Sequence, residues 1–326
     1  VGAIDTGVDG THPALAGRWR GLTAPPEECW LDAAGQGDTD FPVDRRGHGT
    51  HVMGTLVGLA PGDTIGVAPG AQWIASNVIV LPEPDEFFDN AVLASLEFMA
   101  DPDGDPATVD DVPAVVQNSW GVSERWDGYY DCDSRWWDAI DACEAAGPVI
   151  IWAAGNEGPG PESLRSPADR ATSPTNSFAV GSTSTAIPLE ISEFSSRGPS
   201  GCGGEFAIKP EVVAPGEDIY SAYPNGQYAW ISGTSQAAPH IAGVVALMRQ
   251  AAPDLDVATI KEILMATAID RGVVGEDNTY GNGFVDAYAA VSMVMTNVGS
   301  VAGRITDSAS GLPLDQVSVQ DLRGQA

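Results

Sequence analysis

The stretch Gly233–His240 reads Gly-Thr-Ser-Gln-Ala-Ala-Pro-His and leads into an apolar run, Ile241–Met248, that is typical of a buried helix. The first N–H groups of a helix lack acceptors within it, and the helix dipole places partial positive charge at this end. The hydroxyl of Ser235 is expected to be exposed at this junction, where an oxyanion would be stabilised. Pro239 fits the first turn, since the N–H that it lacks would have no helical acceptor there. Alone, the stretch fits a capped structural helix and a nucleophilic serine equally well.

Short apolar runs alternate with helical patterns along most of the chain, and several runs end at a glycine-flanked polar residue. The predicted buried strands are Val1–Ile4, Trp73–Val80, Ala114–Gly121, Pro148–Ala154, Phe178–Gly181 and Val212–Gly216. The other helical patterns are Met53–Leu59, Glu86–Ala100, Trp136–Ala146, Asp256–Ala268 and Ala287–Met295. This alternation predicts an α/β fold with a mostly parallel central sheet that is covered by helices on both faces.

The pattern of the sequence changes near its end, from alternating helices and strands to strand-like residues alone. Thr296–Ser300 is typical of a linker, and strand-like residues follow from Val301. We therefore expect one large domain over residues 1–295 and the short, β-rich start of a β-sandwich over residues 301–326. The part after the linker is too short to complete a sandwich.

Charge is the unusual feature of the composition. The chain has 45 Asp and Glu residues against 15 Lys and Arg, which gives a formal net charge of -30 at pH 7. Such a charge repels nucleic acid and anionic membranes, so neither is expected as a partner. No apolar run approaches the roughly 18 residues that span a bilayer. An acidic surface also stays soluble in high salt, which favours a secreted, monomeric protein in a salty or Ca²⁺-containing extracellular setting.

The positions of the four cysteines do not decide whether disulfide bonds form or which residues they would join. Cys29, Cys132, Cys143 and Cys202 are too few for a disulfide scaffold and lack CxxC spacing. In a secreted protein they permit one or two disulfide bonds, with three full pairings. Buried free thiols explain them equally well, and Cys143 lies within a helical pattern.

Carboxylates alternate in the run Asp101–Asp105, which reads Asp-Pro-Asp-Gly-Asp and is followed by Asp110 and Asp111. Alternate carboxylates are typical of Ca²⁺ loops, but the glycine stands fourth instead of sixth and no glutamate closes the loop, which excludes an EF-hand. A structural Ca²⁺ site at Asp101, Asp103 and Asp105 and a solvated acidic turn remain alternatives, with the turn slightly favoured. No cofactor is expected for catalysis.

Four polar residues together supply what acyl transfer by a serine requires. Asp5 follows the first strand, and His48 stands between glycines at a helix start. Asn156 follows the strand Pro148–Ala154, and Ser235 begins a helix. The chemistry needs a base for the hydroxyl proton, a carboxylate that fixes the tautomer of that base, and donors for the oxyanion. Because the carboxyl ends of parallel strands share one rim, we expect these groups to lie close together.

Two other kinds of site fit these residues less well. His48 and His51 are three residues apart, but no HExxH sequence follows, as a zinc peptidase of that type would need. An α/β-hydrolase esterase would need a Gly-x-Ser-x-Gly sequence, and residue 237 is alanine.

The motifs around the four residues resemble those of the subtilisin-like serine proteases, the subtilase family. These motifs are Asp5-Thr6-Gly7, Gly47-His48-Gly49-Thr50-His51-Val52, Ala153-Ala154-Gly155-Asn156-Glu157-Gly158 and Gly233-Thr234-Ser235 with Ala237-Ala238-Pro239. They occur in the family order, and the resemblance covers about residues 1–295. The segments Asn118–Gly121 and Phe194–Pro199 are similar to the bacillopeptidase F branch of the family. Residues from Val301 resemble the opening of a carboxypeptidase regulatory-like β-sandwich.

The resemblance implies a serine endopeptidase that works through an acyl-enzyme. Ser235 would be the nucleophile, His48 the general base and then acid, and Asp5 the carboxylate that orients His48. The side-chain amide of Asn156 and the backbone N–H of Ser235 would hold the oxyanion.

The resemblance also implies where a protein or peptide substrate binds. The S1 pocket would be flanked by Ser119, Trp120 and Gly121 and by Ala153, Ala154 and Gly155. Backbone pairing with an extended substrate implies broad specificity. Glu157 would border S1, which suggests that a basic P1 residue is accepted beside large apolar ones.

Two departures from the family pattern matter. Gln236 replaces the methionine that usually follows the serine in subtilisins, which removes an oxidisable thioether from the site. The residues that precede the first strand in the family, and that often help to bind Ca²⁺, are missing before Val1, so a truncated domain is expected there and that calcium site is in doubt.

An inactive subtilase-fold module for binding or adhesion is the main alternative, against which the complete set of four residues argues. An acid-acting protease of the sedolisin type would have glutamate in place of His48. We therefore expect a neutral to alkaline pH optimum.

Overall fold

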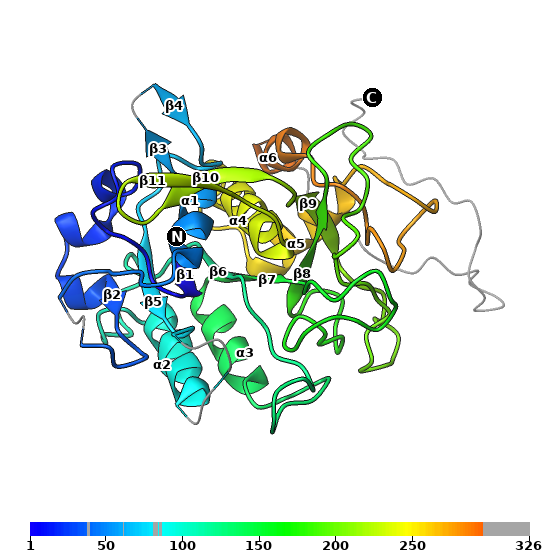
Figure 1. Ribbon diagram of the computed structural model, residues 1–326, viewed down its shortest axis with the longest axis horizontal. Coiled ribbons are helices and arrows are strands. Elements are labelled where there is room, and N and C mark those ends of the chain that lie inside the picture. Colours follow the sequence, from blue (N-terminus) through cyan, green and yellow to red (C-terminus); the bar gives the residue numbers. More distant parts are fainter. Residues whose placement is uncertain (38–39, 61, 81–83, 85–86, 296–326) are drawn as a thin grey trace, which may run out of the picture. The chain divides into compact units, whose positions relative to one another are not determined.

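Seven parallel strands form the central sheet of the computed structural model, in the order β2-β5-β1-β6-β7-β8-β9 (Figure 1). These strands are β1 Gly2–Asp5, β2 Trp30–Leu31, β5 Ile74–Asn77, β6 Val115–Asn118, β7 Val149–Ala153, β8 Phe178–Thr183 and β9 Val212–Pro215. The structure describes residues 1–37, 40–60, 62–80, 84 and 87–295. The predicted linker at 296–300 and the predicted β-sandwich start at 301–326 lie outside the described residues.

Helices cover both faces of the sheet (Figure 1). They are α1 His48–Val57, α2 Phe88–Ala100, α3 Trp137–Ala146, α4 Thr234–Ala251, α5 Val257–Ala266 and α6 Ala287–Met295. On one face α4 packs across β6, β7, β8 and β9, with α1 and α6 against it; α2 and α3 lie together on the other face. The predicted α/β class, with a mostly parallel sheet between two helical layers, is confirmed.

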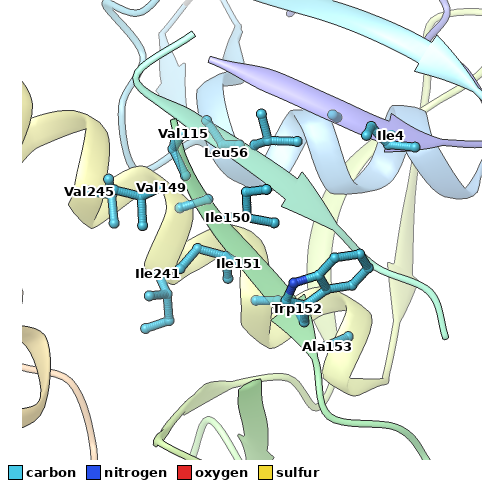
Figure 2. Packing of buried hydrophobic residues seen from close by; sticks show 14 of the residues in the cluster. Ile4, Leu56, Val115, Val149, Ile150, Ile151, Trp152, Ala153, Ile241 and Val245 are labelled. Atoms are coloured by element: carbon cyan, nitrogen blue, oxygen red, sulfur yellow. The ribbon is translucent and has the colours of Figure 1, made fainter. Parts of the chain in front are cut away.

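The core lies between the sheet and these helices. All five residues of β7 are buried, because a strand covered on both faces exposes neither of its alternating sets of side chains. Figure 2 shows Ile241 and Val245 of α4 beside Val149 and Ile151 of β7. The apolar run in the sequence of this strand therefore follows from its central place in the sheet.

Helix α4 begins earlier than the sequence predicts. We expected the helix over Ile241–Met248, with Pro239 in its first turn, but it starts at Thr234 and Pro239 lies inside it. A proline at this position cannot donate a hydrogen bond to the carbonyl of Ser235, four residues before it. The hydroxyl of Ser119 donates to that carbonyl instead (2.7 Å), so the polar group is satisfied by a neighbouring strand end.

A β-hairpin packs against α1, and no sequence pattern predicted it. The hairpin pairs β10 Ile219–Tyr223 with β11 Gln227–Ile231, and a second small pair joins β3 Leu59–Ala60 to β4 Asp63–Thr64. Nε2 of His51, a residue of α1, donates hydrogen bonds to the carbonyl oxygens of Ile219 (3.0 Å) and Ala229 (3.1 Å). The hairpin thus depends on a contact that local sequence patterns do not report.

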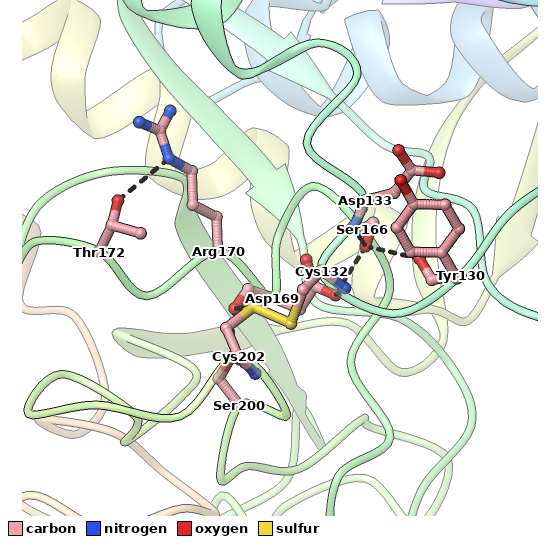
Figure 3. The surroundings of a disulfide bond; sticks show 9 residues. All are labelled: Tyr130, Cys132, Asp133, Ser166, Asp169, Arg170, Thr172, Ser200 and Cys202. Atoms are coloured by element: carbon pink, nitrogen blue, oxygen red, sulfur yellow. Dashed lines mark hydrogen bonds between the residues drawn. A yellow bond between two sulfur atoms is a disulfide. The ribbon is translucent and has the colours of Figure 1, made fainter.

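One disulfide bond joins Cys132 to Cys202, and Cys29 and Cys143 are buried free thiols (Figure 3). The carboxylate of Asp169 accepts hydrogen bonds from the N–H of Cys132 and the hydroxyl of Ser166, both at 2.6 Å. The disulfide bond links residues that are 70 positions apart, and Ser166 lies within the segment that it closes.

Thiol titration in denaturant tests this pairing. We expect two reactive thiols before reduction and four after it. The double variant Cys132→Ser/Cys202→Ser should lose about 2–5 kcal/mol of unfolding free energy, because a cross-link restricts the unfolded chain. Reductant should lower the stability of the wild-type protein and leave the double variant unchanged; equal urea curves for the wild type with and without reductant would contradict the bond.

Candidate active site

A buried carboxylate holds the imidazole of His48. Asp5 is the last residue of β1 and is 1% exposed, and His48 is the first residue of α1. The Nδ1 atom of His48 lies 2.7 Å from Oδ1 of Asp5. This hydrogen bond favours the tautomer with a proton on Nδ1, which leaves Nε2 free to accept one. Sequence reasoning predicted this pair, and the structure brings the two residues together.

Asp44 fixes the start of α1, and sequence analysis missed it. Its Oδ1 accepts from the N–H groups of Arg46 (2.9 Å) and Gly47 (2.7 Å), and its Oδ2 from the N–H of Thr50 (2.9 Å). These are donors that a helix start leaves without partners. No standard capping pattern signals it, because the N-cap residue of α1 is Gly47 and Asp44 lies three residues before it.

The two carboxylates also change the protonation of His48. Burial alone lowers the pKa of His48, but the charge and hydrogen bond of Asp5, together with the charge of Asp44, outweigh burial and raise this pKa above its ordinary 6.5. For His51 burial dominates and lowers the pKa to about 4. His48 is thus tuned to take a proton, while His51 stays neutral and structural.

Ser235 and Ser119 hold each other by two hydrogen bonds. The hydroxyl of Ser235 donates to the carbonyl of Ser119 (3.1 Å), and the hydroxyl of Ser119 donates to the carbonyl of Ser235 (2.7 Å). Ser235 is 9% exposed and lies in the first turn of α4. Ser235 and His48 line the same cavity.

Two N–H donors are left open beside Ser235. Thr234 donates its backbone N–H to Oδ1 of Asn156 (2.9 Å), which fixes the orientation of that amide. Among the described residues, neither Nδ2 of Asn156 nor the N–H of Ser235 has an acceptor. Unpartnered donors at a helix start suit a developing oxyanion. Thr234 is a second positioning residue that the sequence analysis did not single out.

These groups share a cavity of about 440 Å³ at the carboxyl edge of the sheet. Its described lining includes the predicted residues His48, Ser119, Trp120, Gly121, Asn156 and Ser235, and also the aromatic side chains of Phe88 and Trp126. Asp5 lies behind His48, outside the lining. A larger hollow of about 490 Å³ contains Val1 and Arg20 and none of the predicted catalytic residues.

The other predicted substrate contacts, Ala153, Ala154, Gly155 and Glu157, are not among the described residues that line this cavity. Ala153 and Ala154 are buried, and the carbonyl of Ala154 accepts from the N–H of Arg165 (3.1 Å). The N–H of Gly155 donates to the hydroxyl of Thr234 (3.2 Å). Glu157 forms ion pairs with Arg165 and Arg125. As substrate contacts, these four residues stay predictions.

The comparisons with known proteins give a single answer. The family model described as the subtilase family matches residues 1–283. This chain is a subtilase.

Relatives match this subtilase over most of its length. It is 38% identical to bacillopeptidase F of Bacillus subtilis (strain 168) over 94% of its own length but 21% of that protein, so it spans about a fifth of that relative. It is 31% identical to Subtilisin Savinase of Lederbergia lenta, with 89% of each chain covered. The solved structure of the S41 psychrophilic protease covers 87% of the chain with a TM-score of 0.68 and 28% identity, and 89% of that structure is covered.

The acidic loop differs from its prediction. The structure gathers carboxylate oxygens of Asp101, Asp103 and Asp111 within 4.8 Å of one another, and Asp105 is outside this group. Instead, Asp105 accepts a hydrogen bond from the N–H of Ala107 (3.1 Å) and donates its own N–H to Asp103 (2.8 Å). A structural Ca²⁺ site in this loop stays a prediction.

The contrast between the two histidines can be measured directly. In a pH titration followed by NMR, His48 of this subtilase should titrate above 6.5 and His51 near 4, for the reasons given above. Asp5→Asn removes the nearest negative charge and should lower the pKa of His48 while that of His51 stays in place. A His48 pKa that is unchanged in Asp5→Asn would contradict the assigned pair.

Proposed function

We propose that this subtilase domain is an extracellular serine endopeptidase with Asp5, His48 and Ser235 as its catalytic triad. The observation that carries the proposal is the hydrogen bond between His48 and Asp5, at the edge of a cavity that also contains Ser235 and Asn156. A base oriented by a carboxylate beside a serine at a helix start is the arrangement that acyl transfer needs.

The reaction follows from the positions of these groups. The hydroxyl of Ser235 turns from the Ser119 carbonyl toward Nε2 of His48, loses its proton to that nitrogen and attacks the peptide carbonyl. The oxyanion accepts hydrogen bonds from the N–H of Ser235 and Nδ2 of Asn156. His48 then gives the proton to the leaving amine, which leaves an acyl-enzyme. Water deprotonated by His48 hydrolyses that ester and restores Ser235.

An extended protein segment is the proposed substrate. Among the described residues, the backbone N–H and carbonyl of Gly121 have no hydrogen-bond partner, so a substrate backbone can pair with them. Recognition through the backbone depends little on side-chain identity, which supports broad specificity away from the cleavage site.

The location and the assembly are proposed on more general grounds. A disulfide bond persists in oxidising compartments, which supports secretion. The high net negative charge supports a monomer, because like-charged copies repel each other. None of the described helices is long and apolar enough to cross a membrane. An inactive binding module is disfavoured, because it would have no need of the oriented Asp5–His48 pair.

Covalent labelling by a fluorophosphonate tests the proposal. The wild-type protein should be labelled at Ser235, and Ser235→Ala should lose both the label and most peptide hydrolysis. Asn156→Ala removes one oxyanion donor and should lower kcat by about 10²–10³. Labelling of Ser235→Ala, or a wild-type protein with the correct fold that takes no label, would overturn the proposed activity.

The residue after the nucleophile generates a second test. Gln236 is 1% exposed and has no thioether, so the wild-type enzyme should keep its activity in millimolar peroxide. Gln236→Met is the matched variant, and we expect it to lose activity with first-order kinetics as its sulfur is oxidised. Rapid inactivation of the wild-type enzyme would mean that another site controls its sensitivity.

A further inference from the structure

We infer that Arg165 makes the S1 pocket selective for an acidic P1 side chain, that of Glu or Asp. This inference rests on the proposed peptidase function and names the substrate preference of the same site. It reverses the expectation that a basic P1 residue is accepted beside Glu157.

Arg165 lies between the two segments that are predicted to flank S1. Its N–H donates to the carbonyl of Ala154 (3.1 Å), and its neighbour Ser166 exchanges two backbone hydrogen bonds with Val122 (2.8 and 2.9 Å). A Cβ atom placed on Gly121 would come within 2.8 Å of Cβ of Arg165, and one placed on Gly155 within 3.2 Å of its Cγ. Glycine at both positions leaves room for the arginine stem, which closes the space between the two segments.

Glu157 and Trp126 fix the guanidinium group. Nε of Arg165 donates to Oε2 of Glu157 (2.9 Å), and Nη2 donates to Oε1 of the same carboxylate. The guanidinium carbon lies 5.1 Å from the centre of the Trp126 ring, which is itself part of the cavity lining. Nη1 has no partner among the described residues and remains available to a ligand. A two-point ion pair of this kind sets direction as well as strength.

The negative charge of Glu157 is already paired with two arginines, so it does not attract a basic P1 side chain. Its carboxylate is shared by Arg165 and by Arg125, whose Nη1 lies 3.2 Å from Oε1. Two arginines against one carboxylate leave a formal charge of +1 in this group. A lysine or arginine at P1 would meet that positive charge, whereas a carboxylate would pair with it.

The rest of the cavity supports the same sign of charge. Its described lining contains two arginines, Arg46 and Arg165, and no Asp or Glu. The chain as a whole carries three acidic residues for every basic one, 45 against 15. The described part of the lining is therefore positive although the chain as a whole is acidic, and this sign matches an anionic ligand group.

A set of peptides that differ only at P1 tests the inference. At low ionic strength, kcat/KM for Glu should exceed that for the isosteric but uncharged Gln by roughly tenfold, which is 1.4 kcal/mol, a magnitude typical of a partly screened charge pair. Lys at P1 should be the poorest of the charged residues. The preference for Glu over Gln should shrink as NaCl is added.

Three variants assign the effect to Arg165. Arg165→Met keeps an unbranched stem between the two segments and should bring the Glu/Gln ratio to about one. Arg165→Lys keeps the charge and should retain part of the preference, so a change in packing alone is distinguishable. Arg125→Ala removes one of the two positive charges beside Glu157 and should lower the ratio, but by less than Arg165→Met does, because the Arg125 side chain is exposed and its charge is screened.

The outcomes separate this inference from the proposed function. If no peptide is cleaved and Ser235 takes no fluorophosphonate label, the peptidase function itself fails. A labelled, active wild-type enzyme that cleaves the Lys peptide better than the Glu peptide would overturn the role of Arg165. A Glu/Gln ratio that is the same in the wild type and in a labelled Arg165→Met enzyme would overturn it as well.

Discussion

The contact between the end of β6 and the start of α4 is the constraint on which the site depends. Ser119 and Ser235 hold each other through two hydrogen bonds. Pro239 removes the helical donor for the Ser235 carbonyl, so the first turn of α4 needs Ser119 to satisfy it. Thr234, in the same turn, anchors Asn156. One helix start therefore fixes the serine, the amide that faces it and one wall of the cavity relative to the sheet.

Asp44 provides the corresponding constraint for α1. Besides the N–H groups at the helix start, its carboxylate accepts from the hydroxyl groups of Thr6 and Thr50. Thr6 follows Asp5 directly, so the end of β1 and the start of α1 are tied to one buried charge. The same charge raises the pKa of His48, and the packing of the helix and the basicity of the imidazole are thus linked.

Most of the sheet and the pair Asp5–His48 could be predicted because their signals are local. A buried parallel strand reads as an apolar run, and its polar end marks the rim. That α4 runs through Pro239 could not be predicted, since the carbonyl that this proline leaves without a donor is satisfied by Ser119, which lies 116 residues before Ser235. The β10–β11 hairpin depends similarly on His51. Arg165 stands in a loop rich in glycine and proline, where no periodic pattern reports that two glycines far apart in sequence make room for its stem.

The charge of the whole chain and the charge of its cavity have opposite signs, and they act over different distances. The repulsion between the acidic surface and an acidic substrate is long-ranged, and salt weakens it over a Debye length of about 8 Å at physiological ionic strength. The pairing of a P1 carboxylate with Arg165 takes place in a partly enclosed cavity at contact distance, where screening is weaker. Added salt therefore weakens both: the repulsion, which an acidic segment meets whatever its P1 residue, falls most, and the P1 pairing, which alone distinguishes Glu from Gln, falls less. A salty setting is the condition in which an acidic chain with an arginine in its cavity could bind an acidic peptide segment without opposition from its own surface.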